Sequence, residues 1–328
     1  MRLHKLTLLL PLLGGACDAA PVLSPAAPAE WKSASRPGSV SEGTLTGADG
    51  VQLFYRVRGT GPDTAIVVTG GPGLSIAYMD RDLTPLEAGR TLIYYDQRGA
   101  GYSQLVSTPD SLALDRHIED LDAVRRHFGL ERVSLVGHSW GAMLSSGYAA
   151  RYPQHVGRLV LVTPGPIETQ YAIEFEQVVA SRTDSASLAK QLELMQRLPA
   201  APNANAVCDS IFDILFAATM HDPAAVHTMR GRWCEGPNKA AQTVFFSLTS
   251  GRASLGMPWN IRPMLNTIKA PTLVIHASSD AIPYLSTKAY ADTIPGAELL
   301  VIDRAGHSPW LERPEVFFPA VNRFLRKP

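Results

Sequence analysis

Short runs of apolar, largely β-branched residues recur along the chain and alternate with segments of helical periodicity. Runs of this length that are apolar throughout are typical of strands buried on both faces of a parallel sheet. One intervening segment is clearly amphipathic, because apolar residues recur at spacings of three and four between Ile118 and Phe128, with charged residues between them. The alternation predicts an α/β fold, a mostly parallel sheet flanked by helices. The runs lie at residues 66–68, 92–95, 133–136, 159–162, 273–275 and 299–302.

The alternation stops between residues 166 and 262, where helical patterns such as residues 187–198 and 210–220 occur without a convincing strand run. Strand patterning resumes at residue 271. A helical cap inserted between two late strands of one sheet explains this most economically. The predicted organisation is therefore a core of residues 44–165 and 263–328, opening with an Asp-Gly hairpin, and a cap of residues 166–262.

The first sixteen residues begin with positively charged residues, continue with a short apolar segment and end with small residues. This is the pattern of a secretory signal peptide. Residues 17–43 are rich in Pro, Ala and Ser, which predicts a leader segment. We therefore expect an exported protein, periplasmic or secreted. A lipid anchor attached to Cys17 is one alternative, and it is the one membrane contact that we expect. Against it, Gly14 stands where lipoprotein signals usually carry Leu.

Composition excludes several functional classes. The 30 basic residues are balanced by 30 acidic ones, which leaves no electrostatic footprint for nucleic acid. An apolar content of 45% is too high for a disordered chain. Three cysteines form neither a disulfide scaffold nor a four-cysteine zinc site, and we expect no metal or organic cofactor.

The sequence Gly-His-Ser-Trp-Gly at residues 137–141 follows a predicted strand and opens a predicted helix. In this context Gly-x-Ser-x-Gly predicts a tight turn in which side chains at the glycine positions would collide with neighbouring backbone. The turn would expose Ser139 at the end of the strand, ahead of a helix N-terminus that favours developing negative charge. Ser139 is therefore the predicted nucleophile.

A serine hydroxyl needs a base, and candidates follow later in the chain. His307 comes just after the last strand, and Asp280 just after the strand before it, so both fall where sites of open α/β sheets collect. His307 would take the proton from Ser139, and Asp280 would hold the imidazole. Asp303 is the competing acid, ranked lower because it precedes His307 by only four residues.

A glycine-rich segment, Thr-Gly-Gly-Pro-Gly at residues 69–73, follows another strand and would let backbone approach a substrate carbonyl. The N–H groups of Gly71 and Trp140 are the predicted oxyanion-hole donors. The segment is not a phosphate loop, since no Gly-Lys-Ser/Thr follows it.

Four segments together resemble the α/β-hydrolase superfamily and, within it, the proline iminopeptidase family. The resemblance covers about residues 45–324, and its most specific part is an Asp-Gln-Arg-Gly segment. By themselves, Asp96 and Arg98 of that segment predict only a local pair. The four segments are Gly-Gly-Pro-Gly at 70–73, Asp-Gln-Arg-Gly-Ala-Gly-Tyr-Ser at 96–103, Gly-His-Ser-Trp-Gly at 137–141 and Gly-His-Ser-Pro-Trp at 306–310.

The resemblance implies that acidic cap residues bind the free α-amino group of a peptide substrate. Residues 233–236, Trp-Cys-Glu-Gly, are similar to a Trp-Glu-Gly segment of the family with one residue inserted, which makes Glu235 the implied amine ligand. A solvated surface carboxylate is the alternative for Glu235. Three departures from the family leave proline preference open. Thr69 stands where the family usually has His, and His138 stands where close members often have Gly. Most members are also cytosolic, whereas this chain has the pattern of an exported protein.

The cap also holds Cys208 and Cys234, which either pair in an oxidising compartment or remain thiols. The predicted activity is hydrolysis of an amide after a free-amine N-terminal residue, with proline one candidate, through an acyl-Ser139 intermediate. The expected partner is a small peptide, amino-acid amide or ester. A carboxylesterase of the same fold is the alternative, and a catalytically idle binding protein is a third reading from a different class.

Overall fold

The computed structural model describes residues 40–106, 108–237, 255–256 and 258–326. The predicted signal peptide, Cys17 and nearly all of the predicted leader lie outside the described residues. Within the described part, strands form one sheet in the order β1-β2-β4-β3-β5-β6-β7-β8. Their bounds are β1 Val40–Thr46, β2 Gln52–Gly59, β3 Asp63–Val68, β4 Arg90–Tyr95, β5 Val133–His138, β6 Val156–Val162, β7 Thr272–Ala277 and β8 Glu298–Ile302.

The sheet is mostly parallel, as the apolar runs predict. All six runs lie in strands, and the antiparallel pairs are those that β2 makes with β1 and β4. The predicted hairpin is present, with Thr46 opposite Gln52. The leader boundary needs a correction, because β1 begins at Val40 and residues 40–43 belong to the sheet.

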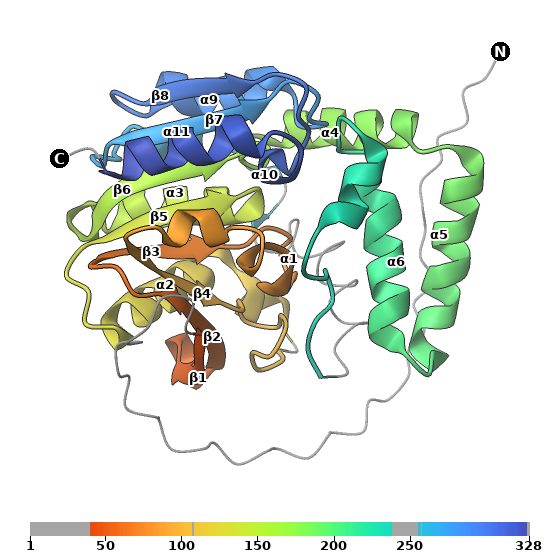
Figure 1. Cartoon of the computed structure of the whole chain (residues 1–328), viewed down its shortest axis with the longest axis horizontal. Helices are drawn as coiled ribbons and strands as arrows, with labels where there is room; N and C mark the ends of the chain where they lie inside the picture. Colours follow the sequence, from red (N-terminus) through yellow and green to blue (C-terminus); the bar gives the residue numbers. More distant parts are fainter. Residues whose placement is uncertain (1–39, 107, 238–254, 257, 327–328) are drawn as a thin grey trace.

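Helices cover both faces of the sheet (Figure 1). The α-helices are α1 Ala77–Asp80, α2 Leu114–His127, α3 Trp140–Arg151, α4 Thr169–Arg182, α5 Ser185–Arg197, α6 Ala204–Ala217, α8 Arg262–Leu265, α9 Tyr284–Thr293, α10 Pro309–Glu312 and α11 Pro314–Arg326. Short 3-10 turns are η1 Ala48–Gly50, η2 Thr84–Glu87, η3 Pro109–Leu112, η4 Pro153–His155, η5 Leu198–Ala200 and η6 Pro223–Thr228. No helix in the described ranges is long and apolar enough to cross a bilayer.

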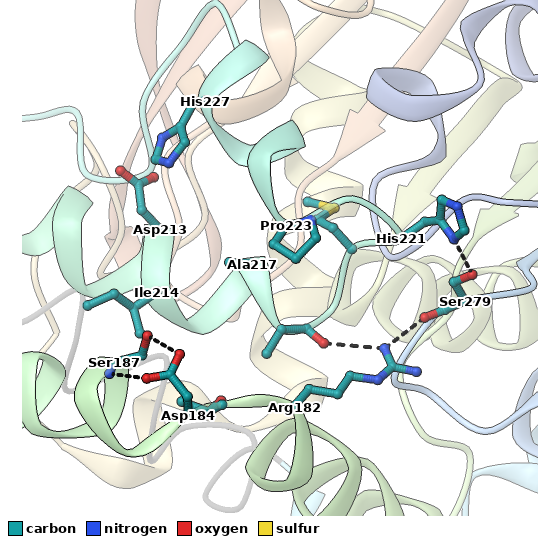
Figure 2. Close-up of a pocket in the computed structure, with 13 residues that line it drawn as sticks. Arg182, Asp184, Ser187, Asp213, Ile214, Ala217, His221, Pro223, His227 and Ser279 are labelled. Carbon is teal, nitrogen blue, oxygen red and sulfur yellow. Dashed lines mark hydrogen bonds between the residues drawn. The ribbon is translucent and has the colours of Figure 1, made fainter.

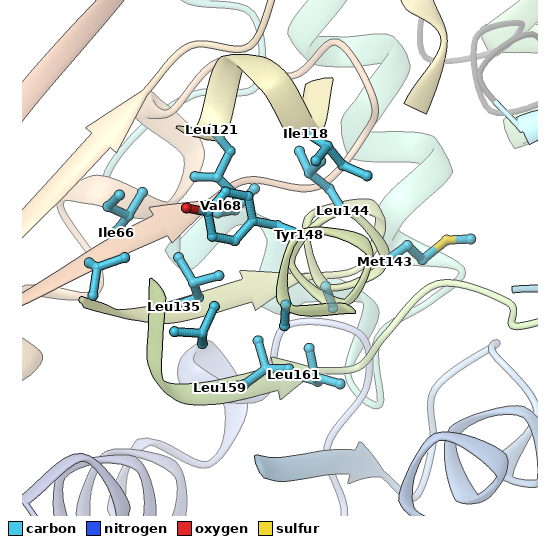
Figure 3. Close-up of a cluster of buried hydrophobic side chains, with 14 of the residues drawn as sticks. Ile66, Val68, Ile118, Leu121, Leu135, Met143, Leu144, Tyr148, Leu159 and Leu161 are labelled. Atoms are coloured by element: carbon cyan, nitrogen blue, oxygen red, sulfur yellow. The ribbon is translucent and has the colours of Figure 1, made fainter. Parts of the chain in front are cut away.

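The core lies on both sides of the sheet because successive strand residues point to opposite faces. In β3, Ile66 and Val68 pack with α2 and α3, whereas Ala65 and Val67 pack toward α1 and α11. Figure 3 shows the first of these layers, where leucines of β5 and β6 meet side chains of α2 and α3. This packing fixes the strand ends at which the predicted site residues lie.

The segment between β6 and β7 is helical in its described part and projects beside the sheet as α4, α5 and α6 (Figure 1). The predicted helix at 187–198 is α5 with the turn η5. The predicted helix at 210–220 is α6, which begins earlier, at Ala204, where the side chain of Asn203 accepts a hydrogen bond from the amide of Ala206. Residues 238–254 and 257 of the predicted cap lie outside the described residues.

A disulfide joins Cys208 of α6 to Cys234, which settles the two outcomes left open for these cysteines. Both residues are buried, and the bond closes a separation of 26 residues within the cap. The bond ties the segment around Cys234 to α6.

Replacing both cysteines by alanine should lower the free energy of unfolding of the oxidised protein by roughly 3–4 kcal/mol, since an open loop of this length gains conformational entropy when unfolded. Denaturant unfolding with and without a reductant measures this. The reductant should destabilise the wild type and leave the double variant unchanged. Equal midpoints for oxidised wild type and variant would contradict the prediction.

Candidate active site

Ser139 is the single residue between β5, which ends at His138, and α3, which begins at Trp140. Its φ of 53° and ψ of −120° lie in a region that non-glycine residues rarely adopt. The Ser139 amide donates to the carbonyl of Val162 on the neighbouring strand at 3.0 Å, which holds this conformation. The tight strand-to-helix turn predicted from the sequence is therefore present.

The two glycines of the turn have no room for a side chain. A Cβ on Gly137 would lie 2.5 Å from the carbonyl oxygen of Gly141 and 2.6 Å from the hydroxyl oxygen of Ser145. A Cβ on Gly141 would collide with the carbonyl oxygen of Val68. The absence of side chains at these two positions therefore lets α3 pack directly against the ends of β5 and β3.

His307 and Asp280 are brought together from the loops after β8 and β7. Nδ1 of His307 lies 3.0 and 3.1 Å from the two carboxylate oxygens of Asp280. Both side chains are almost completely buried, which strengthens the interaction and fixes the ring. Asp303 instead accepts a hydrogen bond from the Ser278 hydroxyl at 3.0 Å. Of the two acids considered, Asp280 is thus the one in contact with His307.

Ser139 and His307 line one cavity of about 470 Å³, a size typical of small-molecule sites. Its described lining is largely apolar and comes from the core and from α4, α5 and α6. The lining side chains that give this character are Met143, Phe175, Val179, Leu188, Phe212, Leu215, Phe216, Leu255, Trp259 and Ile282. A nucleophile, a base with its carboxylate and an apolar cavity are the components of acyl transfer.

Gly71 and Trp140, the predicted oxyanion donors, both line this cavity. The loop that carries Gly71 is held by Gln97, whose side-chain NH₂ donates to the carbonyl of Thr69 at 2.8 Å. The Gln97 carbonyl oxygen accepts from the indole N–H of Trp140 at 2.9 Å. One amide side chain therefore spans the glycine-rich loop and the start of α3.

The expected local pair of Asp96 and Arg98 is wrong. Asp96 accepts hydrogen bonds from the backbone N–H groups of Ile76 and Tyr102, both at 2.8 Å. Arg98 makes a buried bidentate contact with Asp120 of α2 at 2.7 and 2.9 Å. Asp96 and Arg98, the neighbours of Gln97 in the sequence, therefore bind different segments of the chain.

The structure pairs Glu235 with two arginines of the core. One carboxylate oxygen lies 3.2 Å from the guanidinium of Arg81, and the other lies 3.8 Å from that of Arg56. Glu235 is not among the described residues that line the cavity. Its placement therefore supports a structural ion pair between the cap and the core, not the implied amine-binding role.

Glu176 of α4 is the acidic residue among the described lining of the cavity, and sequence reasoning missed it. No residue of α4 is fully buried, so the helix lacks the strong amphipathic signal of a core helix. A weaker signal exists, since Ala172, Phe175 and Val179 recur at spacings of three and four and all line the cavity.

A second cavity, of about 640 Å³, lies beside the first, and Thr183 lines both. Figure 2 shows that its polar side chains mostly bond to one another or to backbone. Arg182 donates to the carbonyls of Ala218 and Ser279, and Nδ1 of His221 lies 2.8 Å from the Ser279 hydroxyl oxygen. These contacts join α4 to the loop that carries Asp280. In neither cavity do described His, Cys, Asp or Glu residues form a group that could hold a metal ion.

Comparison with known proteins agrees with this geometry. The profile of the alpha/beta hydrolase fold family matches residues 66–314. Proline iminopeptidases of Clostridium botulinum and Heyndrickxia coagulans are 27% and 25% identical to the chain. The matches cover 84% and 87% of this chain and 95% and 98% of theirs.

Solved structures give the same fold. The proline iminopeptidase of Mycobacterium smegmatis superposes with a TM-score of 0.62 at 22% identity, over 87% of this chain and 97% of that one. A thermophilic esterase from Thermogutta terrifontis superposes with a TM-score of 0.61 at 23% identity, over 87% and 98%. The profile match, the sheet order and the strand-to-helix turn at Ser139 lead to one conclusion: the chain belongs to the α/β-hydrolase fold family.

Proposed function

We propose that this chain is a serine hydrolase that cleaves the amide bond after a free-amine N-terminal residue of short peptides or amino-acid amides. The observation that carries the proposal is Glu176, the carboxylate in the largely apolar described lining of the Ser139 cavity. Relatives that bear the name proline iminopeptidase support it. The substrate's amine would lie near Glu176, and its apolar side chain against the aromatic wall.

The chemistry follows from the triad. Ser139 Oγ attacks the carbonyl carbon while Nε2 of His307 takes its proton, and Asp280 stabilises the charged imidazole. The N–H groups of Gly71 and Trp140 donate to the oxyanion that forms. The proton then passes from His307 to the leaving amine as the C–N bond breaks. Water attacks the acyl-Ser139 ester by the same route and releases the free amino acid.

Replacing Glu176 by Gln should raise KM for a free-amine arylamide about three- to tenfold, because a partly solvated ion pair contributes about 1 kcal/mol. Its kcat should change little, since the amine lies away from the reacting bond. Glu235→Gln is the matched control and should leave KM within twofold. An unchanged KM in Glu176→Gln would remove Glu176 from the amine site.

A carboxylesterase is the second candidate, favoured by the largely apolar cavity and by a structural neighbour that is an esterase. The discriminating experiment compares an aminoacyl arylamide, its N-acetylated form and a short-chain nitrophenyl ester. We expect the free-amine arylamide to be cleaved and N-acetylation to abolish most of the rate. Ester hydrolysis alone would favour the esterase, and failure to cleave any of the three would favour the binding protein.

We also propose that the protein is exported. The signal-like pattern of residues 1–16 supports this, and a disulfide in the cap is typical of oxidising compartments. Lipid attachment at Cys17 stays a prediction, which mass measurement of the protein from its native membrane fraction would test.

A further inference from the structure

A chain of buried hydrogen bonds joins the predicted oxyanion loop to the main chain of His307. The amide of Gly70 donates to the Tyr78 hydroxyl oxygen at 2.6 Å, and that oxygen lies 2.7 Å from Nδ1 of His138. On the opposite side of the same ring, Nε2 lies 2.9 Å from the carbonyl oxygen of His307. Tyr78, His138 and His307 are at most 2% exposed, so the whole chain lies in the low-dielectric interior.

The donor and the acceptor of each hydrogen bond can be assigned by starting from the His307 carbonyl oxygen at one end of the chain. A carbonyl oxygen only accepts, so Nε2 of His138 carries the proton and Nδ1 is the acceptor. The Tyr78 hydroxyl then donates to Nδ1 and accepts from Gly70. Burial, and secondarily the charge that His307 carries when protonated, lowers the pKa of His138 well below its ordinary value. The ring therefore stays neutral and keeps this tautomer, and His138 is not a second base.

Both ends of the chain touch groups that the reaction needs. A Cβ built on Gly70 would lie 3.0 Å from Cβ of Ser139, so this part of the loop packs directly against the nucleophile. The next residue, Gly71, carries the predicted oxyanion donor, which belongs to the peptide directly after the one that Tyr78 holds. At the other end, the His307 carbonyl also accepts from the Thr163 hydroxyl at 2.9 Å, which fixes the main chain beside the base.

We propose that His138 is a positioning residue that, together with Tyr78, holds the oxyanion loop in register with His307 during acyl transfer. Neither residue is among the described lining of the cavity, so both act through their neighbours. The Tyr78 ring also stacks on Trp233, with ring centroids 5.3 Å apart, so packing places the ring while its hydroxyl orients the loop. Losing the chain therefore impairs transition-state stabilisation more than ligand binding.

The first test is Tyr78→Phe, which keeps the ring and removes only the hydroxyl. A fluorophosphonate reports the effect, because Ser139 Oγ displaces fluoride from phosphorus through the same base and oxyanion donors, whatever the natural substrate is. The maximal rate of phosphonylation should fall about tenfold, less than the loss of a direct donor. The reagent concentration for half-maximal rate should stay within twofold.

The second test uses the histidine. His138→Leu should slow phosphonylation at least as much as Tyr78→Phe, and the double variant should be no slower than His138→Leu, because both act through one chain. His138→Gln should recover most of the rate, since its amide offers both an acceptor and a donor. Tyr148→Phe is the control: it removes a buried hydroxyl that bonds to Asp122 and Arg125 elsewhere, and should react within twofold of wild type.

Three results would overturn the proposal: a Tyr78→Phe rate within twofold of wild type, a loss confined to the half-maximal concentration, or losses that multiply in the double variant. Tyr78→Phe decides alone if His138→Leu does not fold. Since the reagent requires no amine, these outcomes do not depend on the proposed aminopeptidase specificity.

Discussion

Ser139→Ala is expected to lower kcat about 10⁴- to 10⁶-fold on whichever substrate the wild type cleaves, with the fold and KM retained. Removing a nucleophile leaves only the oxyanion hole and substrate binding to act, and these alone recover a small part of the rate. The change should be well tolerated, because alanine removes one oxygen and adds no atom at a tightly packed turn. Steady-state kinetics on highly purified variant protein measure the effect.

The control for this prediction is Ser146→Ala on α3. Ser146 is buried, and its hydroxyl donates to the carbonyl of Ala142 at 2.8 Å, within the helix and outside the described cavity lining. Its kcat should stay within a few-fold of wild type. A Ser139→Ala enzyme that keeps more than about one per cent of wild-type kcat would exclude Ser139 as the nucleophile.

Asp280→Asn is expected to lower kcat about 10⁴-fold. The carboxylate accepts the Nδ1–H of His307 and leaves Nε2 free to take the serine proton, whereas an amide can stabilise the opposite tautomer. Measuring kcat for Asp303→Asn in parallel tests this, because both variants make the same chemical change at different positions. Asp303 contacts Ser278 and not His307, so its variant should stay within twofold of wild type. A larger loss in Asp303→Asn than in Asp280→Asn would reverse the assignment of the acid.

The strands, the contact of Asp280 with His307 and the position of Ser139 at the same cavity could be predicted because they depend on local patterns. Buried parallel strands are recognisable as apolar runs, and Asp280 and His307 follow two such runs directly. The start of the first strand lacks such a pattern, since Val40–Thr46 lies at the sheet edge, alternates mostly exposed and half-buried residues and has no continuous apolar run.

The residues of the proposed amine site could not be predicted in the same way. Glu235 sits in a family-like segment, but its ion partners Arg81 and Arg56 are distant in sequence, and only the fold brings them together. The cavity-facing side of α4 is half-buried, so Glu176 lies in a segment with little periodicity to separate it from a surface helix. The hydrogen-bond chain through His138 likewise depends on contacts between segments distant in sequence, because it joins the loop after β3, helix α1, the end of β5 and the loop after β8.

The most direct test of the account is to react the intact protein with a fluorophosphonate and locate the adduct by peptide mass spectrometry. The account predicts one adduct per chain, on Ser139, absent from Ser139→Ala and formed far more slowly in Asp280→Asn. An unlabelled protein, or an adduct on any other residue, would contradict the claim that this chain is a hydrolase acting through Ser139.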